Sequence, residues 1–232
     1  MMFIPVDESS DRIERPLDGA SIEPVPMLAL ALAGFFSTRL FELPLILASS
    51  SAIRRQLLDS AGVDHRAMAP DVDEAAIKER VNDAAELASH LAAAKALSIP
   101  SDAWVIGSDS VVSVDGRLFD KPRDRTDAEH HLRLFSGKQI NLTSAVALAH
   151  GGAVDWCHCD TATLQVRDLS DTFIRSYLDA EWPAVGYTVG VFRLEGRGVQ
   201  LFNRIDGDHF TILGMPLVPL LGALRERGLV DR

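Results

Sequence analysis

The segment from Leu45 to Leu58 constrains the fold of this chain more than any other. Four apolar residues, Leu45 to Ala48, are followed by three serines and then by a stretch, Ala52 to Ser60, with two arginines near its start. This order predicts a buried strand, a short loop and a helix. Free N–H groups at a helix start favour an anion, and nearby hydroxyl and guanidinium groups favour phosphate.

The candidate phosphate ligands in this segment are Ser49, Ser51, Arg54 and Arg55. The alternative is a polar turn followed by a solvated helix face. Successive helical residues point about 100° apart, so we do not expect both arginines to face one ligand equally.

The composition is that of a water-soluble globular protein with an acidic balance. Of 232 residues, 47% are hydrophobic and 24% charged, and the formal net charge is -10. An acidic chain lacks the broad basic footprint of non-specific nucleic-acid binding, so we expect no nucleic-acid partner. A local basic pocket for a small anion remains compatible with this charge.

Residues 1–42 are expected to form an N-terminal extension outside a main domain of residues 43–232. We expect residues 1–26 to be poorly ordered and residues 27–41 to form a short surface helix. The apolar run Met27 to Phe36 is too short to span a bilayer, and the acidic residues before it do not resemble a signal peptide. These features predict a cytoplasmic protein without a membrane partner.

The two cysteines, Cys157 and Cys159, flank His158. On a strand their Cα atoms would lie roughly 6.5–7 Å apart, at or beyond the usual limit for a disulfide. No second ligand pair follows at the spacing of a zinc site. We therefore expect two free strand cysteines in a reducing compartment.

Hydrophobic periodicity and turn residues predict a chain that alternates strands and helices. The expected strands are Leu45–Ala48, Val63–Ala69, Trp104–Val114, Ile140–His150, Val154–Val166 and Val199–Ile205. The expected helices are Ala52–Ser60, Ala84–Leu97, one opened by a capping box at Thr126–Glu129 and running to Phe135, Ser170–Leu178, and Pro216–Arg227.

Several of these strands follow one another through hairpin turns, so the sheet must be mixed rather than all parallel. The fold class is therefore an α/β protein with a mixed twisted sheet flanked by helices. We expect two lobes with a central cleft that holds the site.

Two acidic positions are candidates for chemistry. Asp109 follows the apolar pair Val105-Ile106 and a glycine, where a carboxylate is costly unless it is solvated or paired. It is either a strand-end cap or a general base or metal ligand. Asp71, Asp73 and Glu74 form either a solvated turn or a place where Glu74 helps to hold a divalent cation.

Two lysines and two histidines have simpler explanations. Lys95 lies on the alanine-rich helix, where a surface position is the simplest interpretation, and Lys121 precedes Pro122, which keeps its backbone extended. Both lysines gain interest only if they converge on phosphate. His130 and His131 are adjacent on a helix, and we expect both at the surface.

Taken together, these motifs resemble the Maf family of nucleoside triphosphate pyrophosphatases over about residues 44–228. The matching motifs, in the family's order, are Leu47-Ala48-Ser49-Ser50-Ser51 with the basic residues and Leu57-Leu58 after it, Val72-Asp73-Glu74, Lys95-Ala96, Gly107-Ser108-Asp109, Lys121-Pro122, Ser136-Gly137, Glu195-Gly196, Ile205-Asp206-Gly207-Asp208 and Leu213-Gly214-Met215-Pro216-Leu217.

The resemblance implies a Mg²⁺-dependent hydrolase that cuts a nucleoside triphosphate between its α and β phosphates, and it implies a homodimer. It assigns Asp109, Glu74 and Lys121 to catalysis, and Glu74 and Asp109 also to the metal. The implied substrate-binding residues are Ser49, Ser51, Arg54, Lys95, Ile53, Ser110 and Glu195. Alternatives are a dTTP/UTP pyrophosphatase and a nucleotide-binding regulator of cell division without activity.

The chain departs from the family pattern at three places. The signature proline is Ala52, the residue before Lys121 is Asp120 where many members have glycine, and the Thr-Gly after the Ser-Gly turn is Thr143-Ser144.

Three positions tied to the base are Ile53, Ser110 and Glu195. The family resemblance favours the 7-methylguanosine triphosphate branch through Glu195, because a carboxylate accepts from guanine N–H groups and complements a cationic base. Ile53 and Ser110 match neither branch cleanly.

Overall fold

The computed structural model describes residues 45–231. The expected extension over residues 1–42 lies outside this range, as do its predicted surface helix and poorly ordered start. Within residues 45–231 no helix has the length and apolarity needed to cross a bilayer.

Sixteen elements follow one another along residues 45–231. In chain order they are β1 (Leu45–Ala48), α1 (Ala52–Ser60), β2 (Arg66–Met68), α2 (Glu74–Lys78), α3 (Ala84–Leu97), β3 (Trp104–Val114), β4 (Arg117–Phe119), α4 (Arg125–Phe135), β5 (Gln139–His150), β6 (Ala153–Val166), α5 (Asp171–Glu181), the 3₁₀ helices η1 (Ala184–Tyr187) and η2 (Arg197–Leu201), β7 (Phe202–Asp206), α6 (His209–Ile212) and α7 (Leu217–Glu226).

The strands form one mixed sheet, as predicted. Its order is β2-β1-β3-β5-β6-β7, and β4 pairs with β3 outside this path. β1 is parallel to β2 and β3, whereas β5, β6 and β7 pair antiparallel with their neighbours. Glycine turns account for the hairpins, because Gly116, Gly151 and Gly152 all have positive φ angles.

One edge of β3 is left open between two short partners. β1 pairs with β3 only as far as Gly107, and β4 begins to pair at Val112. β5 occupies the other edge of β3 along its length. Residues 108–111 of β3 therefore have no strand on the side that β1 and β4 share, and this gap leaves room for a site.

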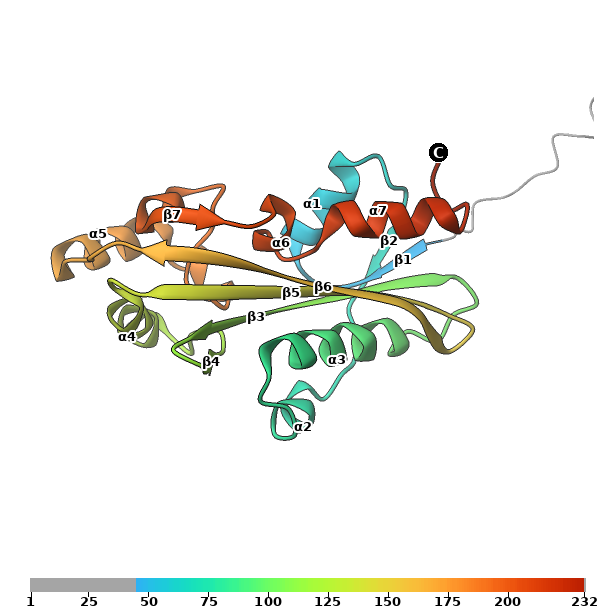
Figure 1. The fold of residues 1–232 in the computed structure, drawn as a ribbon, viewed down its shortest axis with the longest axis horizontal. Coiled ribbons are helices and arrows are strands. Elements are labelled where there is room, and N and C mark those ends of the chain that lie inside the picture. Colours follow the sequence, from blue (N-terminus) through green and yellow to red (C-terminus); the bar gives the residue numbers. More distant parts are fainter. Residues whose placement is uncertain (1–44, 232) are drawn as a thin grey trace, which may run out of the picture. The chain divides into compact units, whose positions relative to one another are not determined.

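Helices cover both faces of the sheet (Figure 1). One apolar cluster joins α3 to β1, β3 and β5, and another joins α1 and α7 to the opposite face of the same strands. A third cluster lies under α4 and α5 at the far end of the sheet. The sheet is thus the middle layer at the place where β3 has its gap. The expected division into two lobes stays a prediction.

The strongest periodic segments were predicted to the residue. β1, α1, α3 and β3 have the expected bounds, and Ser51 and Ser170 cap α1 and α5 through their hydroxyl groups. Both cysteines on β6 are free, as expected.

Five expectations about local structure were wrong. The capping box at Thr126 does not form, because the Asp124 carboxylate already accepts from the Asp127 N–H at 2.8 Å and starts α4 at Arg125. The expected acidic turn instead contains a helix start, because Asp73 is the N-cap of α2, which begins at Glu74. The differing spans are β2, which is shorter than Val63–Ala69, α5, which continues to Glu181, and Arg197–Leu201, which is a 3₁₀ helix before β7.

Two side chains expected at the surface are covered. Lys95 is 8% exposed on α3. The His131 ring packs against Phe119 and Phe135, at centroid distances of 5.3 and 5.8 Å. In both cases the sequence showed a polar residue on a helix but not the neighbour that packs over it.

Gly107 sets the distance between α3 and β3. A Cβ atom at Gly107 would lie 2.1 Å from the Ala92 carbonyl oxygen and 2.4 Å from the Ala96 nitrogen. Only glycine lets the helix backbone rest this close to the strand. Lys95 lies in the same turn of α3, so this contact brings its side chain to β3.

We expect Gly107→Ala to lower the free energy of unfolding by about 3 kcal/mol, because the methyl group overlaps with backbone atoms that cannot move independently. Denaturant unfolding measures the change. The matched control is Gly222→Ala in α7, where an added Cβ meets nothing within 4 Å and alanine should stabilise the helix by about 0.5–1 kcal/mol. Equal stability of Gly107→Ala and the unchanged protein would contradict this account of α3.

Candidate active site

A cavity of about 1410 Å³ opens beside the gap in β3. It collects residues from distant parts of the chain, from Ser49 to Gly214. The ten residues that the family resemblance assigns to the site all line it: Ser49, Ser51, Ile53, Arg54, Glu74, Lys95, Asp109, Ser110, Lys121 and Glu195. The structure thus brings this set together, while the role of each residue stays a prediction.

The Lys95 ammonium group joins two carboxylates at the centre of this cavity. Its Nζ atom lies 2.5 Å from Asp109 Oδ1 and 2.8 Å from Glu74 Oε1. The side chains of Lys95 and Asp109 are only 10% and 13% exposed, whereas that of Glu74 is 41% exposed. Two carboxylates are thereby held on one cation, with Glu74 on the solvent side.

Successive side chains of β3 point to opposite faces of the sheet. Gly107 and Asp109 face α3, and Ser108 and Ser110 face α1 and α6. The hydrogen bonds agree with this division, because Asp109 contacts Lys95 of α3 and Ser110 contacts Arg54 of α1. At the gap in the sheet, both faces reach the same cavity.

Nearby lysines change the acidity of Glu74. Burial raises the pKa of its carboxyl group, but the hydrogen bond from Lys95 and the surrounding positive charges outweigh burial and hold this pKa below its usual value. The charges belong to Lys95, Lys78 and Lys121. Glu74 is therefore an anion at neutral pH, surrounded by three ammonium groups.

A backbone carbonyl and a serine hydroxyl group orient Arg54. Gly214 O accepts from Arg54 Nε at 2.8 Å and also from the hydroxyl groups of Ser108 and Ser110, at 3.0 and 3.3 Å. Arg54 Nη2 donates to Ser110 Oγ at 2.9 Å. Burial lowers the pKa of Arg54, partly offset by the charges of Asp109 and Glu74.

Arg55 is exposed on α1, so only one of the two adjacent arginines faces the cavity. This outcome follows the helical geometry expected from the sequence. Gly214 adopts a φ of 103° that disfavours other residues, and an added Cβ would lie 3.2 Å from Ser110 Oγ.

The serine loop between β1 and α1 is held by its own hydrogen bonds. Ser49 is 5% exposed, and its Oγ accepts from the Ser51 N–H at 3.1 Å. Ser51 is the N-cap of α1 and accepts from the Arg54 N–H. The loop thus lines the cavity at the N-terminus of a helix, where an anion is favoured.

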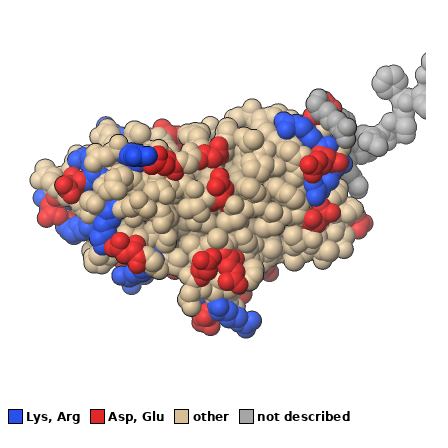
Figure 2. All heavy atoms as spheres, viewed as in Figure 1, with Lys and Arg blue, Asp and Glu red and all other residues tan. Residues whose placement is uncertain are grey.

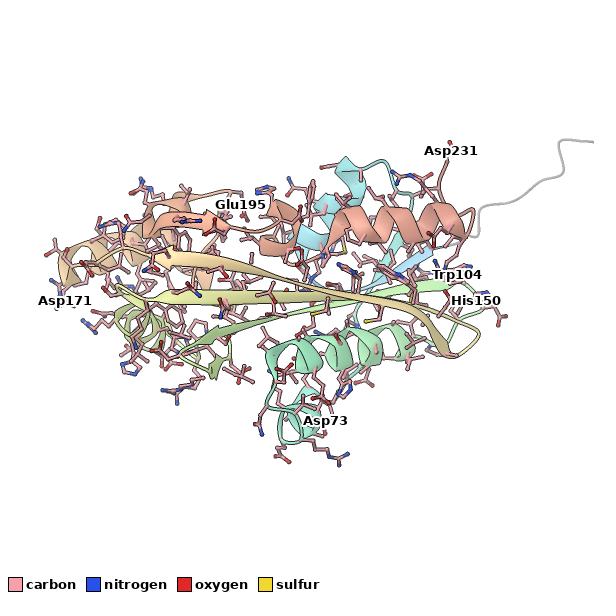
Figure 3. The ribbon with its side chains drawn as sticks, viewed as in Figure 1. Asp73, Trp104, His150, Asp171, Glu195 and Asp231 are labelled. Carbon is pink, nitrogen blue, oxygen red and sulfur yellow. The ribbon has the colours of Figure 1, made fainter. Side chains whose placement is uncertain are left out.

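Glu195 lies at the other end of the cavity from α2. Figure 3 shows it on the opposite side of the sheet from Asp73, the neighbour of Glu74. Its Oε1 atom is 3.7 Å from Arg193 Nε, which is also 3.9 Å from Glu181 Oε2. Arg193 Nε is buried, and it has no hydrogen-bond partner among the described residues.

A strained turn supports this end of the cavity. Val191 has a φ of 56°, in the left-handed region that β-branched residues rarely adopt. Its carbonyl accepts a hydrogen bond of 3.0 Å from the buried Tyr177 hydroxyl, and burial raises the pKa of that hydroxyl, which keeps it a donor. The adjacent Gly190 and Phe192 line the cavity.

The sequence did not point to four functional candidates. Lys78, Asn82 and Arg193 line the cavity as side chains, and Gly214 contributes a carbonyl. Lys78 and Arg193 are single cations without a motif, and a backbone acceptor has no sequence signal. The Leu213–Leu217 motif was recognised, but not that its glycine carbonyl holds Arg54.

The oxygen donors present fit a hard cation that is shared with a phosphate substrate. Glu74 and Asp109 are the two carboxylates that reach the centre, and the described residues contain no cluster of three or more His, Cys, Asp or Glu side chains suited to a metal. Mg²⁺ commonly binds one or two carboxylates together with substrate phosphates and water. The residues therefore suit a metal that arrives with its ligand.

Comparison with known proteins then decides the family. Residues 44–227 match the family model described as Maf-like protein. The chain belongs to the Maf family. This match covers nearly all of the described residues and includes every residue predicted for the site.

Several curated proteins are similar over most of their length. A protein of Rhizobium meliloti named 7-methyl-GTP pyrophosphatase is 46% identical over 194 residues, which cover 81% of this chain and 98% of the relative. A protein of Rhizobium etli with the same name is 44% identical, with the same coverage. A protein of Nitrobacter winogradskyi named nucleoside triphosphate pyrophosphatase is 43% identical and covered over 96% of its length.

We expect Lys95→Met to raise the pKa of Glu74, because it removes both a hydrogen bond and a positive charge. In the unchanged protein the pKa of Glu74 is lower in the folded than in the unfolded state, so Glu74 stabilises the fold at pH values above the pKa of an unfolded glutamate, about 4.3. This stabilisation is lost as the pH falls through the folded-state pKa. The variant should show a smaller loss in this acidic range.

NMR titration of the Glu74 carboxyl group and unfolding measured against pH test this prediction. Lys138→Met is the control, because its ammonium contacts Asp115 outside the cavity. An unchanged Glu74 titration in Lys95→Met would show that Lys95 does not control this carboxylate.

Proposed function

We propose that this protein is a nucleoside triphosphate pyrophosphatase, which hydrolyses a nucleoside triphosphate to a nucleoside monophosphate and pyrophosphate. The arrangement of Lys95, Asp109 and Glu74 carries the proposal. It places two carboxylates and a buried ammonium in a cavity that also contains a serine-lined helix start and Arg54. The names of the relatives agree with this activity.

In this proposal Asp109 accepts a proton from the attacking water. The water oxygen bonds to the α phosphorus, the bond from this phosphorus to the bridging oxygen breaks, and pyrophosphate leaves. Lys95 orients the Asp109 carboxylate through the contact of 2.5 Å. Because phosphoryl transfer depends mainly on positioning and charge stabilisation, no covalent intermediate is needed.

The cations and hydroxyl groups around this centre bind the triphosphate. Ser49 and Ser51 present the start of α1, Arg54 supplies a guanidinium group in a fixed orientation, and Lys121 adds a charge at the mouth. Ser110 has hydrogen bonds with Arg54, Ser144 and Gly214, so its first role is to position Arg54.

Glu74 and Asp109 would hold a divalent cation, which we propose is Mg²⁺. The bound cation would neutralise phosphate charge and favour deprotonation of water. Glu74 is suited to this role because its lowered pKa keeps it ionised and because its side chain is partly open to solvent.

For the base we propose a modified purine, with 7-methylguanosine triphosphate as the leading candidate. Glu195 lies at the end of the cavity away from α2, where its carboxylate would accept from guanine N–H groups and attract a cationic base. Ile53 lines the same cavity. The dTTP/UTP alternative is a possible outcome of the same assay.

Purified protein with Mg²⁺ and a panel of nucleoside triphosphates should release pyrophosphate, fastest from 7-methylguanosine triphosphate. Asp109→Asn should lower kcat by at least about 100-fold, since it removes the general base, while nucleotide binding survives. Asp115→Asn, at an exposed hairpin turn, is the control. Full activity of Asp109→Asn would refute the role of Asp109, and binding without turnover in the unchanged protein would favour a regulator.

We further propose a cytoplasmic homodimer formed by a domain of residues 43–232, on the family resemblance. Sedimentation equilibrium of the full chain should give twice the chain mass of 25.3 kDa, and a single-chain mass at high concentration would contradict the dimer.

A further inference from the structure

Lys78 is a cation of the cavity to which the family motifs assign no role. It is the last residue of α2 and lines the cavity. Its Nζ atom lies 2.5 Å from Asp120 Oδ1 and 3.7 Å from Glu74 Oε2. Asp120 is a position where this chain departs from the pattern of many family members.

The pair extends the charge network of the site in one direction. From Asp109 the contacts run to Lys95, then to Glu74, then to Lys78. Lys78 is thus separated from the general base by two charged groups. A phosphate near Lys78 would therefore lie on the Glu74 side of this chain of contacts, away from Asp109.

The ion pair with Asp120 is easily broken. The side chains of Lys78 and Asp120 are 36% and 71% exposed, and ion pairs of this kind contribute little to stability. The ammonium group of Lys78 can therefore move from Asp120 to a stronger acceptor.

We infer that Lys78 binds the β and γ phosphates of the nucleoside triphosphate, and that Asp120 holds its ammonium group until the substrate arrives. A compact ammonium on a flexible stem suits a phosphate oxyanion, and the exposed Asp120 carboxylate returns to water when released. This inference rests on the proposed function and adds a binding residue to it.

Asp120 has the opposite effect on the substrate. It adds a negative charge at the mouth of a cavity for a polyanion, next to Lys121 in the sequence. Asp120 thereby competes with phosphate for Lys78. A purely structural tether between α2 and the loop before α4 would instead need both members of the pair equally.

The test compares variants at the two positions. Lys78→Met should weaken pyrophosphate binding, measured by calorimetry with Mg²⁺, by about tenfold, the size expected for one lost charge-assisted hydrogen bond. It should raise KM for the triphosphate similarly with a smaller change in kcat. Nucleoside monophosphate should bind as before, and Lys78→Arg should restore most of the pyrophosphate affinity.

Asp120→Asn should tighten pyrophosphate binding several-fold, because it frees Lys78 and removes a competing charge. Lys138→Met is the matched control, since Lys138 and Asp115 form an equally exposed ion pair away from the cavity and should leave pyrophosphate affinity unchanged. Circular dichroism confirms that each variant is folded.

Equal losses of affinity in Lys78→Met and Asp120→Asn would overturn the inference in favour of a tether. Unchanged pyrophosphate affinity in Lys78→Met would also overturn it. If the unchanged protein hydrolyses no triphosphate, the proposed function fails instead, and the calorimetric comparison still decides whether Lys78 binds the phosphates.

Discussion

The contact between the backbones of α3 and β3 at Gly107 is the constraint on which the site depends. It lets a helix lie so close to a strand that Lys95 reaches Asp109 two residues further along β3. An isolated carboxylate or ammonium at this depth would be costly, but together they compensate each other. Glu74 then joins the pair from α2 and remains accessible to solvent.

The gap on the edge of β3 explains why such a pair is open to a ligand. In an uninterrupted sheet, residues on the two faces of a strand are separated by the backbone of the neighbouring strand. Because the pairing of β3 with β1 stops at Gly107 and its pairing with β4 starts at Val112, Asp109 from one face and Ser110 from the other line one cavity. On the face of the molecule that Figure 2 shows, charged side chains of both signs are interspersed and form no continuous basic surface.

The sequence predicted the elements with a clear hydrophobic period and the residues carried by family motifs. It did not predict features that depend on two distant segments meeting. Lys95 was expected at the surface because nothing in α3 reveals the glycine opposite it, and the short helix α2 was hidden in an acidic turn. The capping pattern that starts at Thr126 does not form, because Asp124, two residues earlier, is the N-cap of α4.

The carbonyl of Gly214 has a consequence for the order in which the protein matures. Arg54 depends on an acceptor that lies 160 residues further along the chain. While the ribosome is still making β6, the emerging chain already contains Lys95, Asp109 and Ser110, but the guanidinium group of Arg54 still lacks its backbone acceptor at Gly214. The full set of contacts that orients Arg54 therefore arises only when the segment around Gly214 has been synthesised and has docked against α1.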